Sequence, residues 1–267
     1  MDVPIITLTT DFGYKDPLSG VMKGVILSIN PSVNIVDISH GINKYDVREA
    51  ALTIGTSYSQ FPLRTIHVVV TDPGVGSPRR PLMVIAENYY FIGPDNGVFS
   101  VIYESEYCEV VHLTSDHYFL RKLSSTFHGR DVFAPVAAWL SKGIAVSKFG
   151  ETITDFERLH LPVPSQPTRT TLEGEVILID HFGNAVTNIK ASDLDRLRNE
   201  TKGRLRIVVK GIEAPLKEYY SQAGDKGLYT VIGSMDYLEL FVNRGNASSD
   251  FNIRVGDNIG VMIAAER

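Results

Sequence analysis

Polar side chains that could activate a water molecule follow several apolar segments of the chain. Asp11 comes after "PIITLTT" and Asp72 after "TIHVVV", and both apolar segments are typical of buried strands. The stretch "TDPGVGSPRR" turns at a Pro-Gly step and brings Arg79 or Arg80 back towards Asp72. His128, in "STFHGRD", precedes a glycine and the start of a helix, which suits a ligand-facing loop. Asp72, Arg79 and His128 could together hold or deprotonate a water molecule and stabilise the resulting hydroxide.

Each of these residues also has an ordinary structural explanation. Asp and Asn favour turns and caps, and a lone histidine is more often structural than catalytic. Asp95 and Asn96, in "FIGPDNG", repeat the strand-end pattern, and Asp131 is expected in the first turn of a helix, where it would interact with the helix dipole. Ligands nevertheless collect at the carboxyl ends of parallel strands, so two or three such residues at one edge favour a site.

The elements that must position these residues change in kind along the chain. Up to residue 150, strand-like segments alternate with helical ones, which span 17–31, 46–62 (with Asp46 as N-cap) and 129–143. This alternation predicts an α/β domain over residues 1–160, with a mostly parallel sheet and flanking helices. Prolines in a polar stretch predict a linker over 161–171. Short strands split by glycine turns then predict an all-β, barrel-like domain over 172–267.

Composition excludes several classes of function. The chain has 267 residues and a formal charge of −5, which disfavours nucleic acid and membrane surfaces as partners. Cys108 is the only cysteine, so neither an intrachain disulfide nor a zinc site made of thiolates is possible. The N-terminus is not typical of a signal peptide, and no run of about 18 apolar residues predicts a membrane span. We therefore expect a soluble cytoplasmic protein.

One turn of the second domain could bind a purine. In "IDHFGNAVTNI", Phe182 offers a face for stacking and Asn184 an edge that both donates and accepts hydrogen bonds. The structural alternative is a hairpin with Gly183-Asn184 in its turn and Phe182 packed in the core. The pattern alone favours this alternative.

Seven segments in order give the chain a resemblance to a known family. They are "TLTTDFG", "IVDISHGI", "VVVTDPGVGSPRR", "GPDNG", "STFHGRD", "IDHFGNAVTNI" and "GSMDYLELFVNRGNAS". From about residue 4 to residue 263 the chain resembles the adenosine-forming S-adenosylmethionine hydrolases (S-adenosylmethionine hydroxide adenosyltransferases), relatives of fluorinase and chlorinase. The resemblance implies an N-terminal α/β domain, a C-terminal β-barrel-like domain, and a homotrimer with substrate held between subunits. It also implies attack of water on ribose C5′, release of methionine and adenosine, and no need for a metal or cofactor.

The resemblance also implies roles for individual residues. Asp72, Arg79 and His128 match the set that orders and activates the attacking water. Asp11 would bind the ribose diol, and Tyr45 would lie near the ribose and the sulfonium. The remaining matches are Phe182 and Tyr220 beside adenine, Asn184 at its edge, Asp180 and Ser234 at the amino-acid end of methionine, and Ala247, whose backbone would contact adenine.

Departures from the halogenases favour hydrolysis. Those enzymes have a tyrosine where this chain has Asp72, and a long insertion before the segment that matches "GPDNG". A carboxylate facing the nucleophile would repel a halide ion. Met235 replaces a halogenase arginine near the methionine carboxylate.

Two other functions stay open at this point. A metal-dependent phosphoesterase could use Asp11, Asp16, Asp72 and His128, although Asp16 could simply cap the helix that follows it. A non-catalytic sensor of adenosine or S-adenosylmethionine would need only the binding residues.

Overall fold

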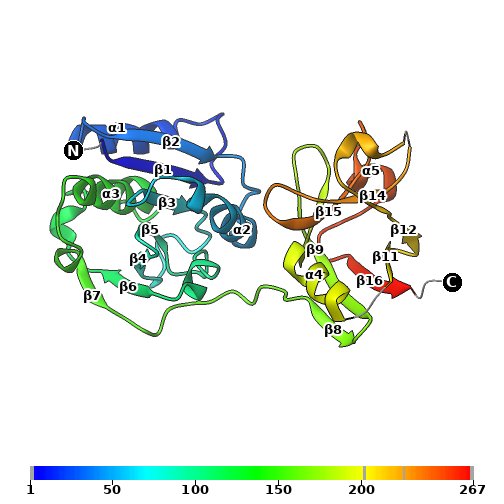
Figure 1. The fold of residues 1–267 in the computed structure, drawn as a ribbon. Helices are drawn as coiled ribbons and strands as arrows, with labels where there is room; N and C mark the ends of the chain where they lie inside the picture. The colour runs from blue at the N-terminus through cyan, green and yellow to red at the C-terminus, as the bar shows by residue number, and fades with distance from the viewer. Residues whose placement is uncertain (1–2, 201–202, 225, 265–267) are drawn as a thin grey trace. The chain divides into compact units, whose positions relative to one another are not determined.

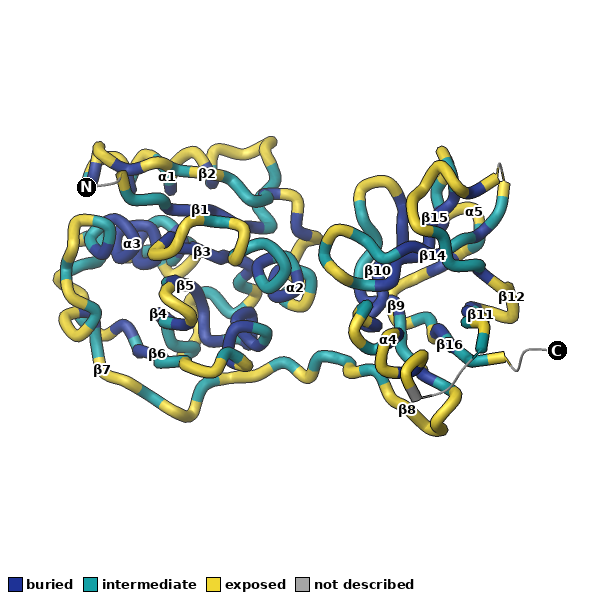
Figure 2. Tube along the Cα trace, viewed as in Figure 1, coloured by how far each residue is buried: buried dark blue, intermediate teal, exposed yellow. Residues whose placement is uncertain are grey.

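The chain forms two compact units, Met1–Leu161 and Pro162–Arg267, in a computed structural model that describes residues 3–200, 203–224 and 226–264 (Figure 1). Each unit has its own hydrophobic core. Figure 2 shows buried residues along the strands of both units and exposed residues along most of their loops. The segments that connect strands and helices are therefore the places where side chains can meet a ligand.

The first unit is built on a seven-stranded sheet in the order β2-β1-β3-β5-β4-β6-β7. Its strands are β1 (Ile5–Thr10), β2 (Asn34–Ser39), β3 (Ile66–Val70), β4 (Pro81–Ala86), β5 (Tyr89–Pro94), β6 (Cys108–Leu113) and β7 (Gly150–Thr152). The pairs β1–β2, β1–β3 and β3–β5 are parallel, whereas β4 is antiparallel to β5 and β6, and β7 is antiparallel to β6. Five strands (β1, β2, β3, β5 and β6) thus run one way and two (β4 and β7) the other. This confirms the mostly parallel sheet.

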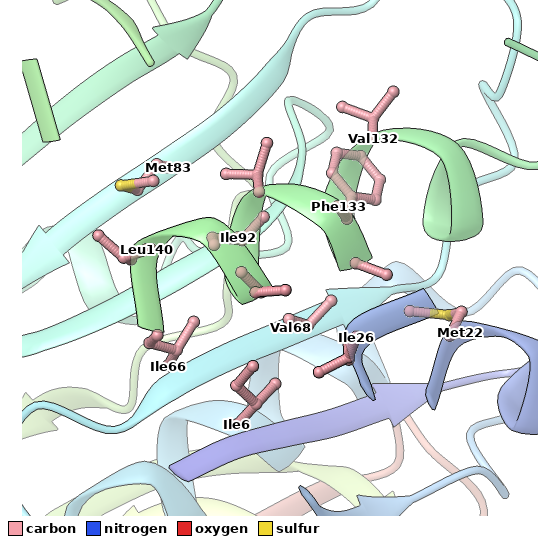
Figure 3. Packing of buried hydrophobic residues seen from close by; sticks show 14 of the residues in the cluster. Ile6, Met22, Ile26, Ile66, Val68, Met83, Ile92, Val132, Phe133 and Leu140 are labelled. Carbon is pink, nitrogen blue, oxygen red and sulfur yellow. The ribbon is translucent and has the colours of Figure 1, made fainter. Parts of the chain in front are cut away.

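Helices cover both faces of this sheet. Helices α1 (Leu18–Ile29) and α3 (Ala134–Ser141) lie over one face, where Ile26 packs in the same cluster as Val68 of β3 (Figure 3). Helix α2 (Val47–Ser57) belongs to the core of the other face, with Ile54 in the same cluster as Val69. Neighbouring residues of β3 therefore point into different cores, which explains why every residue of "IHVVV", including His67, is buried.

The helix starts agree only partly with the sequence prediction. Asp46 caps α2, because its carboxylate accepts a hydrogen bond from the Glu49 amide at 2.9 Å. Asp16 does not cap α1: Pro17 occupies the N-cap position and makes no side-chain capping bond. The carboxylate of Asp16 is therefore not used in the helix.

A π-helical turn, Gly129–Phe133, precedes α3 directly after His128. Pro135 has no amide hydrogen to donate to the carbonyl of Asp131, which instead accepts from the Leu120 amide at 2.9 Å. The side chain of Asp131 is fully buried, where it pairs with Arg130 and accepts from the Ser124 amide at 2.6 Å. Asp131 thus lies in the first turn of this helical segment, as expected, but it is buried and paired. The residue anchors the loop that carries His128.

The second unit is dominated by a curled sheet in the order β12-β11-β16-β9-β10-β15-β14-β13, with β8 paired to β9. Its strands are β8 (Ser165–Thr168), β9 (Thr171–Ile179), β10 (Ala185–Lys190), β11 (Arg204–Val209), β12 (Ile212–Glu213), β13 (Leu216–Lys217), β14 (Tyr229–Ile232), β15 (Tyr237–Phe241) and β16 (Asn258–Ala264). The described strands form an open half-barrel, consistent with the barrel-like prediction.

Two helices accompany this sheet. They are α4 (Ala191–Glu200), which follows β10, and the short α5 (Ala247–Phe251), which lies between β15 and β16. Part of the stretch predicted as a linker, 161–171, is the strand β8, because Ser165 and Thr168 pair with β9. No helix in the described ranges is long and apolar enough to cross a lipid bilayer.

Candidate functional site

Arg79 joins Asp72 and His128 into one polar cluster at the carboxyl end of β3. Its Nε donates to Asp72 Oδ1 at 3.0 Å, and its Nη2 donates both to Asp72 Oδ2 and, at 2.8 Å, to His128 Nδ1. The side chains of Arg79 and Asp72 are only 8% and 5% exposed. The structure thus brings together the three residues that the sequence singled out for water activation.

Arg80, the other candidate for pairing with Asp72, has a different partner. Its Nε donates to Asp95 Oδ2 at 2.8 Å, and its Nη1 donates to Asp155 Oδ1 at 2.9 Å. Asp95 is buried and also accepts from the Glu157 amide at 2.8 Å. Asp95 therefore holds the segment after β7 in place, while Asp11 and Asp72 are the carboxylates that line a cavity at this edge of the sheet.

The hydrogen bond from Arg79 fixes the protonation of His128. A guanidinium can only donate, so Nδ1 of His128 must accept and the proton of the neutral ring is on Nε2. Burial and then the charge of Arg79 lower the pKa of His128, against the opposing effects of Asp72 and Asp131. His128 is therefore a neutral imidazole that offers an N–H from Nε2.

Asp11 holds a strained loop at the neighbouring strand end. It follows β1 directly, and its Oδ2 accepts from the Tyr45 amide at 2.9 Å. Tyr45 has φ +66°, in the left-handed region, and its side chain is 71% exposed. Strained backbone of this kind is concentrated at functional sites, and here it presents an aromatic ring to solvent beside a carboxylate.

A buried histidine supports the strand end that carries Asp11. Thr10 Oγ1 lies 2.8 Å from His40 Nδ1, and the carbonyl of His40 accepts from the Gly13 amide at 2.7 Å. His40 Nε2 in turn lies 3.1 Å from Asp37 Oδ1. His40 and Asp37 both lie in "IVDISHGI", but their contacts with each other and with Thr10 could not be predicted from that segment.

A cavity of about 500 Å³ lies at this edge of the sheet and is lined by Asp11, Tyr45, Asp72 and His128, with Asp16 and Lys44 also in its wall. Arg79 is not among the lining residues, so it supports Asp72 and His128 from behind. A larger cavity of about 780 Å³ is lined by residues at the starts of β1 and β3 and after α3. It lacks an acid/base group of this kind, so we assign the site to the smaller cavity.

In the second unit, Asp180, Phe182 and Asn184 form the turn between β9 and β10. Asp180 Oδ1 accepts from the Phe182 and Asn184 amides at 2.9 and 2.8 Å, and its Oδ2 accepts from Asn184 Nδ2 at 2.9 Å. The turn closes at Gly183, with φ +83°, as the structural alternative predicted. The expectation that Phe182 packs in the core is wrong: it is 72% exposed, because the Asp180 bonds fold the turn with Phe182 outwards.

Tyr220 and Glu239 form a second polar pair in this unit. The Tyr220 hydroxyl donates to Glu239 Oε2 at 3.1 Å, and its ring meets Phe241 edge-on with 4.9 Å between centroids. Burial raises the pKa of Glu239, which is 5% exposed, and burial together with Glu239 raises the pKa of Tyr220 to about 12. Sequence reasoning missed Glu239. The signal was a carboxylate inside the apolar strand "YLELF".

Ser234 and Ala247 occupy less distinctive positions. Ser234 lies in the turn between β14 and β15, where the Asp236 amide donates to the Gly233 carbonyl at 3.0 Å. Ala247 begins α5, and the whole residue is buried. Among the described residues, no group of three or more His, Cys, Asp or Glu side chains is arranged to hold a metal ion.

These features define a class of protein: an α/β unit with acid/base groups at the carboxyl edge of its sheet, followed by a β unit with exposed aromatic residues in its loops. Residues 6–150 match the family model of the SAM hydroxide adenosyltransferase N-terminal domain, and residues 174–260 match that of the C-terminal domain. The chain therefore belongs to the S-adenosylmethionine (SAM) hydroxide adenosyltransferase family, which confirms the resemblance read from the sequence.

Individual relatives match over nearly their whole length. The chain is 34% identical over 276 residues to an "(R)-S-adenosyl-L-methionine hydrolase" of Methanocaldococcus jannaschii, covering 97% of this chain and 95% of that one. It is 30% identical to a "Fluorinase" of Nocardia brasiliensis, covering 97% of each. An uncharacterized conserved protein from Thermotoga maritima has a similar crystal structure, with a TM-score of 0.89, 33% identity, and coverage of 96% and 99%.

Proposed function

We propose that this protein hydrolyses S-adenosyl-L-methionine to adenosine and L-methionine. The observation that carries the proposal is the Arg79 guanidinium bound to both Asp72 and His128 beside a cavity that also contains Asp11. Relatives named as hydrolases of this substrate, similar along nearly the whole chain, support the same reaction.

The proposed reaction is a displacement at ribose C5′. The oxygen of a water molecule forms a bond to C5′, the C5′–S bond breaks, and its electron pair stays on the sulfur of methionine. Because a sulfonium is already a good leaving group, no acid is needed to protonate it. What the site must supply is a nucleophile positioned in line with the bond that breaks.

Asp72 and His128 can share the task of holding that water. Each Asp72 oxygen uses one lone pair on Arg79, so a lone pair remains to accept the proton that the water loses. His128 Nδ1 is occupied by Arg79, so its Nε2–H can orient the water oxygen as a donor. Asp72 is therefore the proposed base, and Arg79 is the positioning residue that fixes both groups.

Binding of the substrate would use residues of both units. Asp11 keeps lone pairs for the ribose hydroxyls after its bond to Tyr45, whose exposed ring suits a sulfonium. In the second unit, the proposed contacts are Phe182, Tyr220, Asn184 and the backbone at Ala247 for adenine, and Asp180 and Ser234 for the amino-acid end. We further propose a cytoplasmic homotrimer that needs no cofactor and holds its sites between subunits.

Halide transfer, the activity named in the fluorinase relatives, is the competing reaction. Asp72 disfavours it, since a carboxylate that lines the cavity would repel a halide ion at the position of the nucleophile. The same carboxylate can accept a proton from water, which a halide does not require.

The proposal can be tested by incubating the purified protein with S-adenosylmethionine in the presence of EDTA and separating the products by chromatography. We expect adenosine and methionine in equal amounts, with a large loss of product in His128→Ala. His117→Ala is the matched control, because His117 is exposed and lies outside the cavity lining. Substrate bound but recovered intact would instead indicate a sensor. Turnover only after a metal is restored would indicate a metal-dependent hydrolase.

A further inference from the structure

Lys44 lies on a loop whose backbone is held by hydrogen bonds of the residues before and after it. The amide of Asn43 donates to Glu49 Oε2 at 2.9 Å, and the amide of Asp46 donates to the Asn43 carbonyl at 3.0 Å. Between them, Tyr45 is held in the left-handed region by its bond to Asp11. The main chain at Lys44 therefore has a defined position at the cavity wall.

The side chain of Lys44 has no partner in this arrangement. It is exposed, and the described part of the chain contains no ion pair or hydrogen bond to its amine. Among the described residues that line the cavity, Lys44 is the one Lys or Arg side chain, whereas Asp11, Asp16 and Asp72 are carboxylates. The cavity thus combines an excess of negative charge with a single unpaired cation.

These charges complement the charges of the proposed substrate. S-adenosylmethionine carries a sulfonium and an ammonium, which suit the carboxylates, and one carboxylate, which needs a cation. We propose that Lys44 binds the substrate carboxylate and selects for substrates that carry it. The inference rests on the proposed function, and it assigns Lys44 a role in specificity rather than in bond breaking. A flexible four-carbon stem lets the amine reach a carboxylate from a fixed backbone position.

The test compares S-adenosylmethionine with its decarboxylated analogue, which keeps the adenosine, the sulfonium and the amine. Both compounds are assayed for turnover, and their dissociation constants are measured by calorimetry, in wild type, Lys44→Met and Lys44→Arg. Lys15→Met is the matched control, because Lys15 is exposed and unpaired nearby but does not line the cavity.

We expect Lys44→Met to weaken binding and kcat/KM for S-adenosylmethionine about tenfold, as for loss of a charged hydrogen bond. The dissociation constant and kcat/KM for the decarboxylated analogue should not change in Lys44→Met. Lys44→Arg should retain most of the preference for S-adenosylmethionine over the analogue. Equal effects on both compounds, or no effect on either, would overturn the assignment. If the wild type binds both compounds but hydrolyses neither, the proposed function fails, while the two dissociation constants still decide the role of Lys44.

Discussion

Replacing Asp72 by asparagine should destabilise the first unit as well as inactivate it. The pair with Arg79 is almost fully buried, with 5% and 8% of the two side chains exposed. Asparagine keeps one oxygen for Arg79 Nε but turns an N–H towards the donor Nη2, so a buried positive charge loses its counterion. Removing one partner of a buried ion pair lowers the free energy of unfolding by about 3–5 kcal/mol. Since one hydrogen bond survives in Asp72→Asn, we expect a decrease of about 3 kcal/mol.

Fluorescence of Trp139 provides the assay. It is the only tryptophan of the chain and lies in α3, so urea unfolding followed by its emission reports the first unit. Asp16→Asn is the control, because it removes a carboxylate from the same cavity wall without breaking an ion pair. It should change the free energy of unfolding by less than about 0.5 kcal/mol.

A double variant separates lost charge balance from general damage. In Asp72→Asn with Arg79→Met, the uncompensated guanidinium is gone, so part of the stability should return while hydrolysis stays absent. Two results would refute the claim that Asp72 balances the charge of Arg79. Either Asp72→Asn alone lowers the free energy of unfolding by less than about 1 kcal/mol, or Arg79→Met lowers it further in the double variant instead of restoring part of it.

Three further predictions follow from the titrating and buried groups. Proton NMR should show His128 titrating below its ordinary pKa, and Arg79→Met should raise this pKa because one of the two causes of the shift is removed. Burial lowers the pKa of His67 to about 3, so between pH 6.5 and 3 the unfolded chain binds a proton that the folded chain does not. Stability should therefore fall with falling pH, and His67→Gln should reduce that slope by about 1.4 kcal/mol per pH unit in urea titrations. Glu239→Met and Tyr220→Phe should each raise KM about fivefold with little change in kcat, and steady-state kinetics of the double variant should show no further increase, since each change removes the same hydrogen bond.

The sequence was sufficient to predict which residues collect at the sheet edge. Asp11 and Asp72 each follow a largely buried strand, and β1 and β3 pair in parallel, so their carboxyl ends must coincide. The choice between Arg79 and Arg80 could not be made in this way. Successive side chains of an extended segment point in opposite directions, so one arginine reaches Asp72 and the other Asp95, and only the folded chain shows which.

In the second unit, particular hydrogen-bond partners determine the burial of two residues for which the hydrophobic pattern predicts the opposite. In "YLELF", alternation places Leu238 and Leu240 in the core and Glu239 on the opposite, nominally exposed face. The turn that begins at Tyr220 covers that face, so Glu239 is buried as well. Phe182 shows the converse error, because hydrophobicity predicted burial while the bonds from Asp180 determined the direction of the turn. In both cases the outcome depends on a particular partner and not on the local pattern.

The position of the proposed site on adjacent strands has a consequence for the reaction. Asp11 follows β1 and Asp72 follows β3, two hydrogen-bonded neighbours, whose separation in a sheet is about 4.8 Å. Under the proposed function, one carboxylate holds the ribose and the other holds the water that attacks the carbon attached to that ribose. The distance between sugar and nucleophile is then set by the spacing of paired strands. In-line geometry at C5′ can therefore be preorganised by the sheet itself, with Arg79 and His40 preventing the two strand ends from relaxing.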